Sequence, residues 1–462
     1  MNAVERILKA PARAAAVLSA AACVALTGCA TTSGLGAESA VIRAKNRVAP
    51  ALVHIRPVKE VYQQGQRREV PVIGSGFIIT PDGYIVTNEH VAGESRFVRC
   101  VLSDKSEVDA RVVGVDPYTD LAVLKLDLPD RLPYVAFGDS DKLESGQTVI
   151  AMGSPLGLSR SVSMGIVSVT GRHLSGQTDH PFTNWIQTDA AINQGNSGGP
   201  LLNIRGEVIG VNTMVLRGAE NVGFAIPSNL VRQVAEQIMG NGHVRRSWLG
   251  LELQEMLART EDPTRKGVLV AGVDPLSPAF EARIQPGDIL LSVGGTPTNA
   301  RFEEDLPPVN KFIADLPVGE EVRLSLQRGD EIFEVPLVTE ERGGLKGAQV
   351  EFSGWGFTAA ELTPAVVRRA GLDSREGVLV SGAQVGGIAN KAGLAQGDII
   401  LSVDGVKVEN LAGFKEVYDA RVADKTPLVM LSVRNRALHR FVLIKQEAGA
   451  PAPVVEGTSD AE

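Results

Sequence analysis

The sequence predicts a mostly β protein in which a barrel or sandwich domain is followed by two copies of a smaller module. From Val41 to about Met239, short apolar segments follow one another, and each ends in a turn signal such as Pro81-Asp82-Gly83. Many short strands with Gly and Pro turns are typical of an all-β barrel or sandwich. The chain has 49 Gly among 462 residues, which is about 11% against a usual ~7% and suits a fold with many turns.

A helix is expected at the end of this first domain. Ser228 can cap a segment whose apolar residues recur at helical spacing as far as Met239, and Gly240 can stop it. We therefore assign residues 41–240 to the first domain.

The chain after Asn241 repeats itself. The string at residues 267–270 (GVLV) recurs at 377–380, and the motif Gly-Asp followed by apolar residues at 287–293 recurs at 397–403, both at an offset of 110. Each copy has about 95 residues, which is long enough to fold as a separate domain. The two copies are assigned to residues 246–340 and 350–446.

Residues 1–28 are typical of an export signal. Arg6, Lys9 and Arg13 precede an apolar run that ends at Leu26 and is too short to span a membrane. The following Thr-Gly-Cys29 resembles the bacterial lipoprotein signal, in which the cysteine is lipidated. The alternative is an ordinary signal peptide cleaved nearby. Residues 29–40 are small and polar and are expected to be a tether, while residues 447–462 are expected to be a disordered acidic tail.

Charge and cysteine content narrow the function. The formal net charge is −8 with a pI near 5.5, so the chain lacks the basic surface that nucleic-acid binding requires. Loss of the signal and lipidation of Cys29 would leave Cys100 alone, without an internal disulfide. We predict a buried structural thiol there. No metal or cofactor is expected.

The strongest local motif is Gly195-Asn196-Ser197-Gly198-Gly199-Pro200. A catalytic serine needs a tight, exposed turn whose backbone N–H groups point at a developing oxyanion, and glycines permit that backbone. The alternative is a glycine-rich hairpin turn without chemistry.

Two further residues complete a catalytic arrangement. Among six histidines, His90 follows an apolar strand directly and can be held rigidly, although a lone His is more often a surface or core residue. Asp120 begins the strand at 121–124 and suits the partner of a histidine base. Asp116 competes, but it starts an Asp-Pro turn and is expected to cap that backbone. The order His90, Asp120, Ser197 is that of chymotrypsin-like proteases.

With these residues in place, the sequence resembles the HtrA/Deg family of serine proteases. The resemblance covers nearly all of the chain after the signal, and it implies a protease domain of two six-stranded barrels with the site between them, followed by two PDZ domains. The fold class is thus mostly β, with a chymotrypsin-like double barrel. The matching stretches are residues 74–78, 87–91, 119–125, 153–157, 188–193, 195–200 and 223–227.

The resemblance also implies roles for single residues. Ser197 would be the nucleophile, His90 the general base and then acid, and Asp120 its orienting partner. The backbone N–H groups of Gly195 and Ser197 would form the oxyanion hole.

Asn193 and Gln194 would lie on the wall of the substrate pocket. Asp189 could suggest a preference for basic side chains, but its Thr-Asp-Ala-Ala context favours a structural role. In the repeated modules the resemblance points to Leu249-Gly250-Leu251 and Trp355-Gly356-Phe357 as the loops that hold a peptide's terminal carboxylate beside a sheet edge. The alternative is that both are simply strand starts.

The expected protein is an ATP-independent serine endopeptidase, anchored to a membrane by lipid on Cys29 and facing the periplasm of a bacterial cell envelope. It would degrade damaged or unfolded polypeptides, with peptides that end in apolar residues bound by the PDZ domains. Two alternatives stay open: a regulatory protease activated by peptides, and a non-proteolytic holdase or scaffold. A homotrimer is possible by resemblance, although residues 38–60 contain no aromatic residue.

Overall fold

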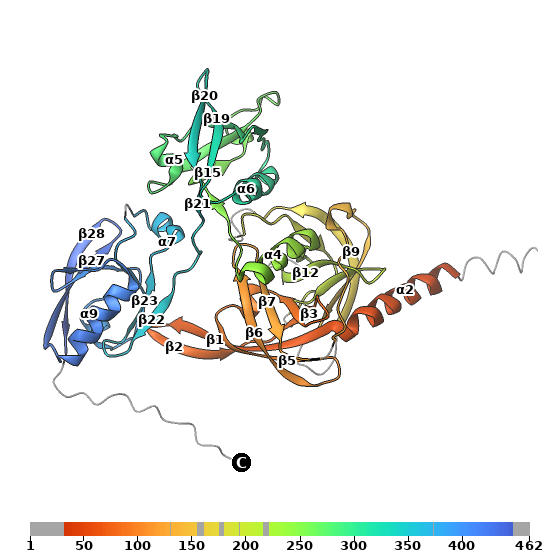
Figure 1. Cartoon of the computed structure of the whole chain (residues 1–462), viewed down its shortest axis with the longest axis horizontal. Coiled ribbons are helices and arrows are strands. Elements are labelled where there is room, and N and C mark those ends of the chain that lie inside the picture. Colours follow the sequence, from red (N-terminus) through yellow and green to blue (C-terminus); the bar gives the residue numbers. More distant parts are fainter. Residues whose placement is uncertain are drawn as a thin grey trace, which may run out of the picture.

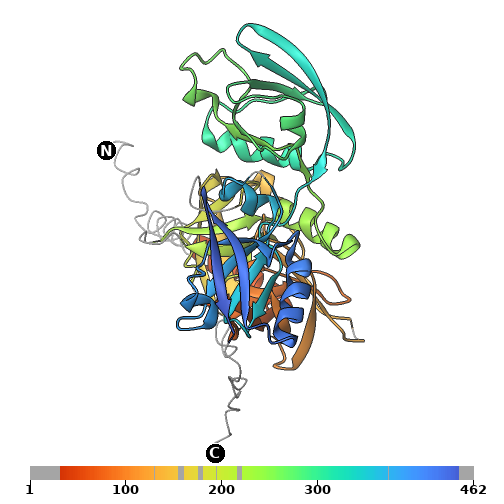
Figure 2. The ribbon, with the colours of Figure 1, turned by 90° about the vertical axis from the view of Figure 1, so that its left-hand side faces the viewer.

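The computed structural model describes residues 32–129, 131–154, 161–174, 180–193, 195–215, 221–372 and 374–446. The expected signal, Cys29, Gln194 and the acidic tail lie outside these residues. Figure 1 shows a large N-terminal domain joined to two smaller β domains, one above it and one beside it, and in the turned view of Figure 2 the first of these again stands above the rest. No helix within the described ranges combines the length and apolar character that a membrane span needs.

The first barrel of the large domain is closed by its longest strand. The strand order is β2-β1-β3-β4-β7-β6-β5, and β1 also pairs with β5, so six strands form a ring while β2 extends from β1 as a hairpin. The strands are β1 (Leu52–Gln63), β2 (Gln66–Pro71), β3 (Gly74–Ile78), β4 (Tyr84–Thr87), β5 (Ser95–Val101), β6 (Glu107–Asp116) and β7 (Leu121–Leu126).

The second barrel is also closed, in the order β10-β13-β12-β11-β8-β9. The prediction of two six-stranded barrels is thereby confirmed. Cys100 on β5 of the first barrel is buried, as predicted, and burial raises the pKa of its thiol to about 12. The strands of the second barrel are β8 (Thr148–Gly153), β9 (Ser161–Arg172), β10 (Trp185–Thr188), β11 (Pro200–Asn203), β12 (Val208–Val215) and β13 (Gly223–Pro227).

Helix α4 (Ser228–Asn241) follows the second barrel and packs against both. Its cap differs from the prediction: Pro227 is the N-cap residue, and the buried Ser228 hydroxyl donates to the Gly138 carbonyl instead. The helix also runs past Gly240 and ends where Gly242 takes a φ of 79°. A side chain that is committed to tertiary structure is not available as a cap.

Helix α2 (Thr32–Val48) differs from the tether expected over residues 29–40. The buried side chains of Ala44 and Val48 belong to the hydrophobic core of the large domain. Lys45 and Arg47 lie in the last turn, where positive charge complements the helix dipole. Because this end of the helix is packed and the helix begins at Thr32, part of the expected tether is helical. In Figure 1 the helix projects from the domain.

The first small domain is a sheet in the order β15-β16-β17-β19-β20. Helix α5 (Pro278–Glu281) follows β16, and helix α6 (Leu306–Ala314) lies near β15. A short ribbon of β14 (Ser247–Trp248) and β21 (Glu340–Glu341) brackets the domain. The strands of the sheet are β15 (Leu251–Gln254), β16 (Val268–Val273), β17 (Ile289–Val293), β19 (Glu321–Arg328) and β20 (Glu331–Val338), with β18 (Thr296–Pro297) paired to β17.

The second small domain repeats this arrangement with one strand more, in the order β22-β23-β24-β25-β27-β28. The repeated sequence blocks fall on equivalent strands, namely β16 with β24 and β17 with β25. The elements are β22 (Gln349–Phe352), β23 (Phe357–Glu361), β24 (Val378–Ala383), β25 (Ile399–Val403), β26 (Val406–Lys407), β27 (Leu428–Asn435), β28 (Leu438–Lys445), α7 (Pro364–Arg369), α8 (Ile388–Lys391) and α9 (Leu411–Ala423).

The repeated Gly-Asp pair has a structural explanation. Asp288 and Asp398 are both buried, and each accepts a backbone N–H and pairs with an arginine, Arg328 in the first copy and Arg440 in the second. Two N–H bonds from one guanidinium hold each carboxylate in place. The motif therefore ties the loop before β17 to the neighbouring strand β19 in the first copy, and the loop before β25 to the end strand β28 in the second.

Candidate active site

His90 and Asp120 lie side by side. Nδ1 of His90 is 2.8 Å from Oδ2 and 3.0 Å from Oδ1 of Asp120, and the His90 backbone N–H donates to the same carboxylate at 2.9 Å. The Asp120 side chain is 4% exposed, whereas that of His90 is 47% exposed. The buried carboxylate thus fixes one ring nitrogen while the rest of the ring faces solvent.

The backbone of Asp120 is held as tightly as its side chain. Its φ is +56°, a conformation that is uncommon for residues other than glycine. The Asp120 carbonyl accepts from the Glu89 N–H at 3.1 Å and from the Asn88 side-chain amide at 3.0 Å. Helix α3 (Glu89–Ala92), which carries His90, is therefore bonded directly to the start of β7.

Asp116, the competing carboxylate, has a different partner. It is buried in an ion pair with Arg246, and it accepts from the Thr119 hydroxyl at 2.5 Å. The expected backbone cap is not what the structure shows: among the described residues the Asp116 carboxylate contacts the side chains of Thr119 and Arg246 and accepts no backbone N–H.

The serine turn lies between β10 and β11 and is fixed by the first barrel. Ser75 on β3 donates its hydroxyl to the Gly195 carbonyl at 2.6 Å and its N–H to the Ser197 carbonyl at 2.9 Å. Gly198 has a φ of +82°, and a Cβ there would lie 2.2 Å from the Ser75 carbonyl. Glycine is therefore required at that position.

Two backbone N–H groups of the turn have no acceptor in the part of the chain that the structure describes. The N–H groups of Asn196, Gly198 and Gly199 donate to backbone carbonyls within or beside the turn. Over the residues that the structure describes, those of Gly195 and Ser197 have no hydrogen-bond acceptor. Unpaired donors on a rigid turn are what an oxyanion would need.

The Ser197 hydroxyl does not contact His90 in this conformation. It donates to the Thr213 carbonyl on β12 at 3.1 Å, and within the described part of the chain it makes no hydrogen bond to the imidazole. Thr213 also accepts from the Asn88 amide through its own hydroxyl at 3.1 Å. The hydrogen bond between a catalytic serine and its histidine often forms only in the substrate complex.

The other residues that the sequence motifs raised, Asn193 and Asp189, have different environments. Asn193 is exposed, and its carbonyl accepts from the Asn196 N–H at 2.9 Å. Asp189 accepts from the Ile166 N–H at 2.7 Å, which supports a structural role. His54, which the motifs did not select, is buried, and burial lowers its pKa; its Nδ1 donates to the Ser154 carbonyl at 2.5 Å.

Sequence reasoning missed Ser75, Asn88 and Thr213. Ser75 stands between two glycines in Gly74-Ser75-Gly76, and Asn88 precedes the histidine helix, so both lie within the matching stretches 74–78 and 87–91. Thr213 carries no comparable signal, because its role depends on a contact with a residue 125 positions away.

The two predicted carboxylate loops have similar geometry. Gly250 and Gly356 have φ values of +84° and +74°. The residue before each glycine accepts from a short helix, Leu249 from Ala279 at 2.9 Å and Trp355 from Ala389 at 2.8 Å.

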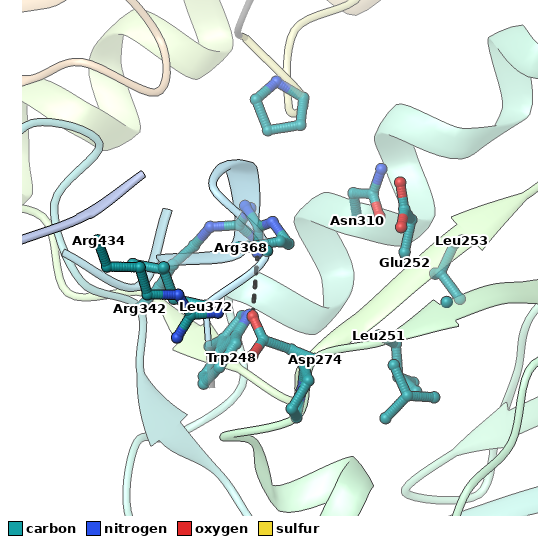
Figure 3. A pocket seen from close by; sticks show the side chains of 16 residues that line it. Trp248, Leu251, Glu252, Leu253, Asp274, Asn310, Arg342, Arg368, Leu372 and Arg434 are labelled. Carbon is teal, nitrogen blue, oxygen red and sulfur yellow. Dashed lines mark ion pairs between the residues drawn. The ribbon is translucent and has the colours of Figure 1, made fainter. Parts of the chain in front are cut away.

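A cavity of about 510 Å³ opens beside Gly250 and β15 (Figure 3). Its wall is completed by Arg342 of the linker and by Arg368 of the second small domain, which pairs with Asp274 at 3.8 Å. The first small domain thus shares this cavity with its neighbours.

Two closed barrels, with a His–Asp pair and a glycine-bounded serine between them, define the class of the protein: a chymotrypsin-like serine peptidase. Comparison with family models agrees. A trypsin-like peptidase domain matches residues 74–211, and PDZ domains match residues 248–338 and 379–430.

Known proteins narrow the class to a family. A probable periplasmic serine endoprotease, DegP-like, of Ectopseudomonas mendocina is 37% identical over 82% of this chain and 81% of its own length. The protein of the same description in Chlamydia trachomatis is 36% identical over 85% of this chain and 78% of its own. The chain belongs to the HtrA/DegP-like family of serine proteases, and it is a serine endopeptidase of the cell envelope.

Solved structures agree with this assignment. The HtrA-type protease AlgW with a tripeptide is 33% identical, with a TM-score of 0.59, over 65% of this chain and 97% of its own. A serine endoprotease from Yersinia pestis is 32% identical, with a TM-score of 0.52, over 65% of this chain and 97% of its own.

Proposed function

We propose that Ser197, His90 and Asp120 are the catalytic triad of an ATP-independent endopeptidase that degrades unfolded or damaged proteins in the envelope. The observation that carries this proposal is the pairing of the exposed His90 ring with a buried carboxylate at 2.8 Å, together with a serine turn in which two N–H groups have no acceptor among the described residues.

The geometry supports the following sequence of steps. The Ser197 hydroxyl leaves the Thr213 carbonyl and attacks the scissile carbonyl while its proton passes to Nε2 of His90. Asp120 keeps the proton on Nδ1 and stabilises the imidazolium. The N–H groups of Gly195 and Ser197 bind the oxyanion.

Collapse of the tetrahedral intermediate breaks the peptide bond, and the leaving amine takes the proton from Nε2 of His90. A water molecule then gives a proton to Nε2 of His90 and attacks the ester carbonyl at Ser197. Collapse of this second intermediate breaks the ester bond, Oγ of Ser197 takes the proton back from His90, and the new carboxylic acid leaves. Asn193 and Gln194 are proposed to lie along the substrate pocket.

Substrate capture is assigned to the loop Leu249-Gly250-Leu251 of the first PDZ domain. An extended peptide with an apolar C-terminus would pair with β15, which stands at the end of its sheet, and place its carboxylate at the loop. The HtrA-type protease AlgW, which resembles this chain, has been solved with a tripeptide, and this supports the proposed peptide capture.

Anchoring and assembly complete the proposal. Lipid on Cys29 would hold the enzyme at a membrane, and radiolabelled palmitate should enter the wild-type chain but not a Cys29→Ala variant. A homotrimer is the proposed assembly, for which sedimentation in detergent should give about three times the mass of the mature chain, which is the 48.9 kDa chain without residues 1–28.

The central test uses Ser197→Ala. Wild-type protein should degrade reduced casein and react with a fluorophosphonate probe, and the variant should do neither while keeping its circular dichroism spectrum. Equal casein degradation by both proteins would refute the triad. Suppression of casein aggregation by wild-type protein, without turnover or probe labelling, would instead indicate a holdase or scaffold.

One observation favours a peptide-activated regulatory protease as a second candidate. The Ser197 hydroxyl donates a hydrogen bond to the Thr213 carbonyl, and this bond must break before the hydroxyl can bond to His90. If a bound peptide supplies that release, peptides with apolar C-termini should accelerate probe labelling of Ser197. A labelling rate that is unchanged at saturating peptide would exclude this mode.

A further inference from the structure

The two PDZ domains differ at the sheet edge where a peptide would add. In the first domain β15 is the end strand of its sheet. In the second, the equivalent strand β23 is already paired with β22, in antiparallel register from Gln349 opposite Ala360 to Phe352 opposite Phe357. An antiparallel strand beside this edge is the position that a bound peptide takes in strand addition.

The backbone N–H groups of the two predicted carboxylate loops also differ in whether they are already hydrogen-bonded. In the second domain, the Trp355 and Gly356 N–H groups both donate to the Phe352 carbonyl, at 3.1 Å and 2.9 Å. In the first domain, the equivalent N–H groups of Leu249 and Gly250 have no acceptor among the residues that the structure describes. The last carbonyl of β22 thus stands where a terminal carboxylate would bind.

The side chain of Phe352 completes the likeness to a bound peptide. It is 1% exposed and packs on three aromatic rings, with centroid distances of 5.1 Å to Phe357, 4.9 Å to Phe414 and 4.8 Å to Tyr418. Phe414 and Tyr418 come from α9, the helix that faces β23. The Tyr418 hydroxyl also accepts from the Gly354 N–H at 2.8 Å, which fixes the turn after Phe352.

We propose that β22 is an internal ligand of the second PDZ domain, with Phe352 in place of the C-terminal residue of a peptide. The loop Trp355-Gly356-Phe357 is therefore closed to external peptides, and only the first domain captures them. This inference rests on the proposed capture of peptides by PDZ loops, and it replaces the expectation that both loops bind carboxylates.

The internal ligand also connects two domains. Glu351 of β22 accepts from the Arg67 N–H of β2 at 3.1 Å. The tip of the β1–β2 hairpin packs so closely on the second PDZ domain that a Cβ at Gly65 would lie 2.4 Å from the Gln384 nitrogen. Figure 1 shows this hairpin reaching from the protease domain to β22. A foreign peptide would have to displace a strand that the hairpin also contacts.

Hydrogen–deuterium exchange of the full-length Ser197→Ala protein tests the proposal without needing a ligand. The Trp355 and Gly356 N–H groups should exchange at least about tenfold more slowly than those of Leu249 and Gly250. A peptide ending in valine, with a free carboxylate, should then slow exchange only at Leu249 and Gly250. Fast exchange at Gly356, or slowing at Trp355 and Gly356 when the peptide is added, would overturn the proposal.

The same experiment distinguishes peptide capture by the first PDZ domain from the internal ligand of the second. If the peptide protects neither loop while Gly356 stays slow, capture by the first domain is wrong, and the internal ligand stands. Phe352→Ala should release β22 and speed exchange at Gly356. Phe441→Ala is the matched control, because Phe441 lies on β28 of the same domain and is 68% exposed. Equal exchange at Gly356 in both variants would count against the role of Phe352.

Discussion

The Tyr118 hydroxyl donates a hydrogen bond of 2.6 Å to the Gly343 carbonyl, which joins a turn two residues before Asp120 to the segment between the PDZ domains. The Arg342 guanidinium lies over the Tyr118 ring at 4.9 Å. Burial of that guanidinium lowers its pKa from the usual arginine value. The segment between the PDZ domains is therefore bonded directly to the turn that precedes Asp120.

Tyr118→Phe should weaken this connection and leave the ring packing intact. We expect a loss of about 1 kcal/mol in the free energy of unfolding, the usual contribution of such a hydrogen bond. Any acceleration of fluorophosphonate labelling by peptides should also fall, while labelling without peptide stays at the wild-type rate. Tyr134→Phe is the control, because Tyr134 is 55% exposed. Full peptide activation in Tyr118→Phe would show that the contact transmits nothing.

Asp120→Asn should keep the fold and remove most of the activity. An amide in this position favours the wrong imidazole tautomer, and in serine proteases the expected loss in kcat is about 10⁴-fold. Casein hydrolysis measures the loss, and circular dichroism checks the fold. Asp109→Asn, at a 76% exposed side chain, should retain wild-type turnover. Activity within about tenfold of wild type in Asp120→Asn would rule out this role for the carboxylate.

Gly198→Ala should be more destabilising than Gly146→Ala. Both glycines have a positive φ, +82° and +92°, so both substitutions strain the backbone by roughly 1–2 kcal/mol. Only at Gly198 would the added Cβ meet another atom, the Ser75 carbonyl at 2.2 Å; at Gly146 nothing lies within 4 Å. Urea unfolding should therefore show a larger loss for Gly198→Ala, accompanied by loss of casein hydrolysis. Equal losses would mean that the turn has room to adjust.

Glu89 predicts a dependence of stability on pH. Burial raises the pKa of this carboxyl above its usual 4.5, although Lys346 and Lys59 act in the opposite direction. Below pH 4.5 the group is protonated in both the folded and the unfolded state. As pH rises from 4.5 through the folded pKa, the unfolded state loses its proton more readily, so ionisation destabilises the fold.

Glu89→Gln should therefore raise the free energy of unfolding at pH 7, and this gain should disappear at pH 4. Urea unfolding of both proteins at the two pH values measures the difference. Glu69→Gln, on the hairpin strand β2, serves as the exposed control. A gain at pH 7 that persists unchanged at pH 4 would show that ionisation of Glu89 is not its cause.

The approach of His90 to Asp120 could be predicted because both residues sit at strand ends that short motifs mark. The pattern of short strands and turns predicted only a barrel or sandwich, and the pair of six-stranded barrels followed from the resemblance to the HtrA/Deg family. Three features were not predictable. The resting bond of Ser197 to Thr213, the clamp of Ser75 on the serine turn and the seating of Phe352 in the second PDZ domain all depend on how distant strands meet. The helical start at Thr32 depends likewise on packing at the other end of its helix.

The bonds from Ser75 to the serine turn have a further consequence. The nucleophile's backbone is anchored to β3 of the first barrel, although the turn itself belongs to the second. A small shear between the barrels would misplace the serine while each barrel kept its own hydrogen bonds. On heating or in denaturant, hydrolysis should therefore be lost before the circular dichroism signal. The enzyme would then be inactive under conditions in which both barrels are still folded.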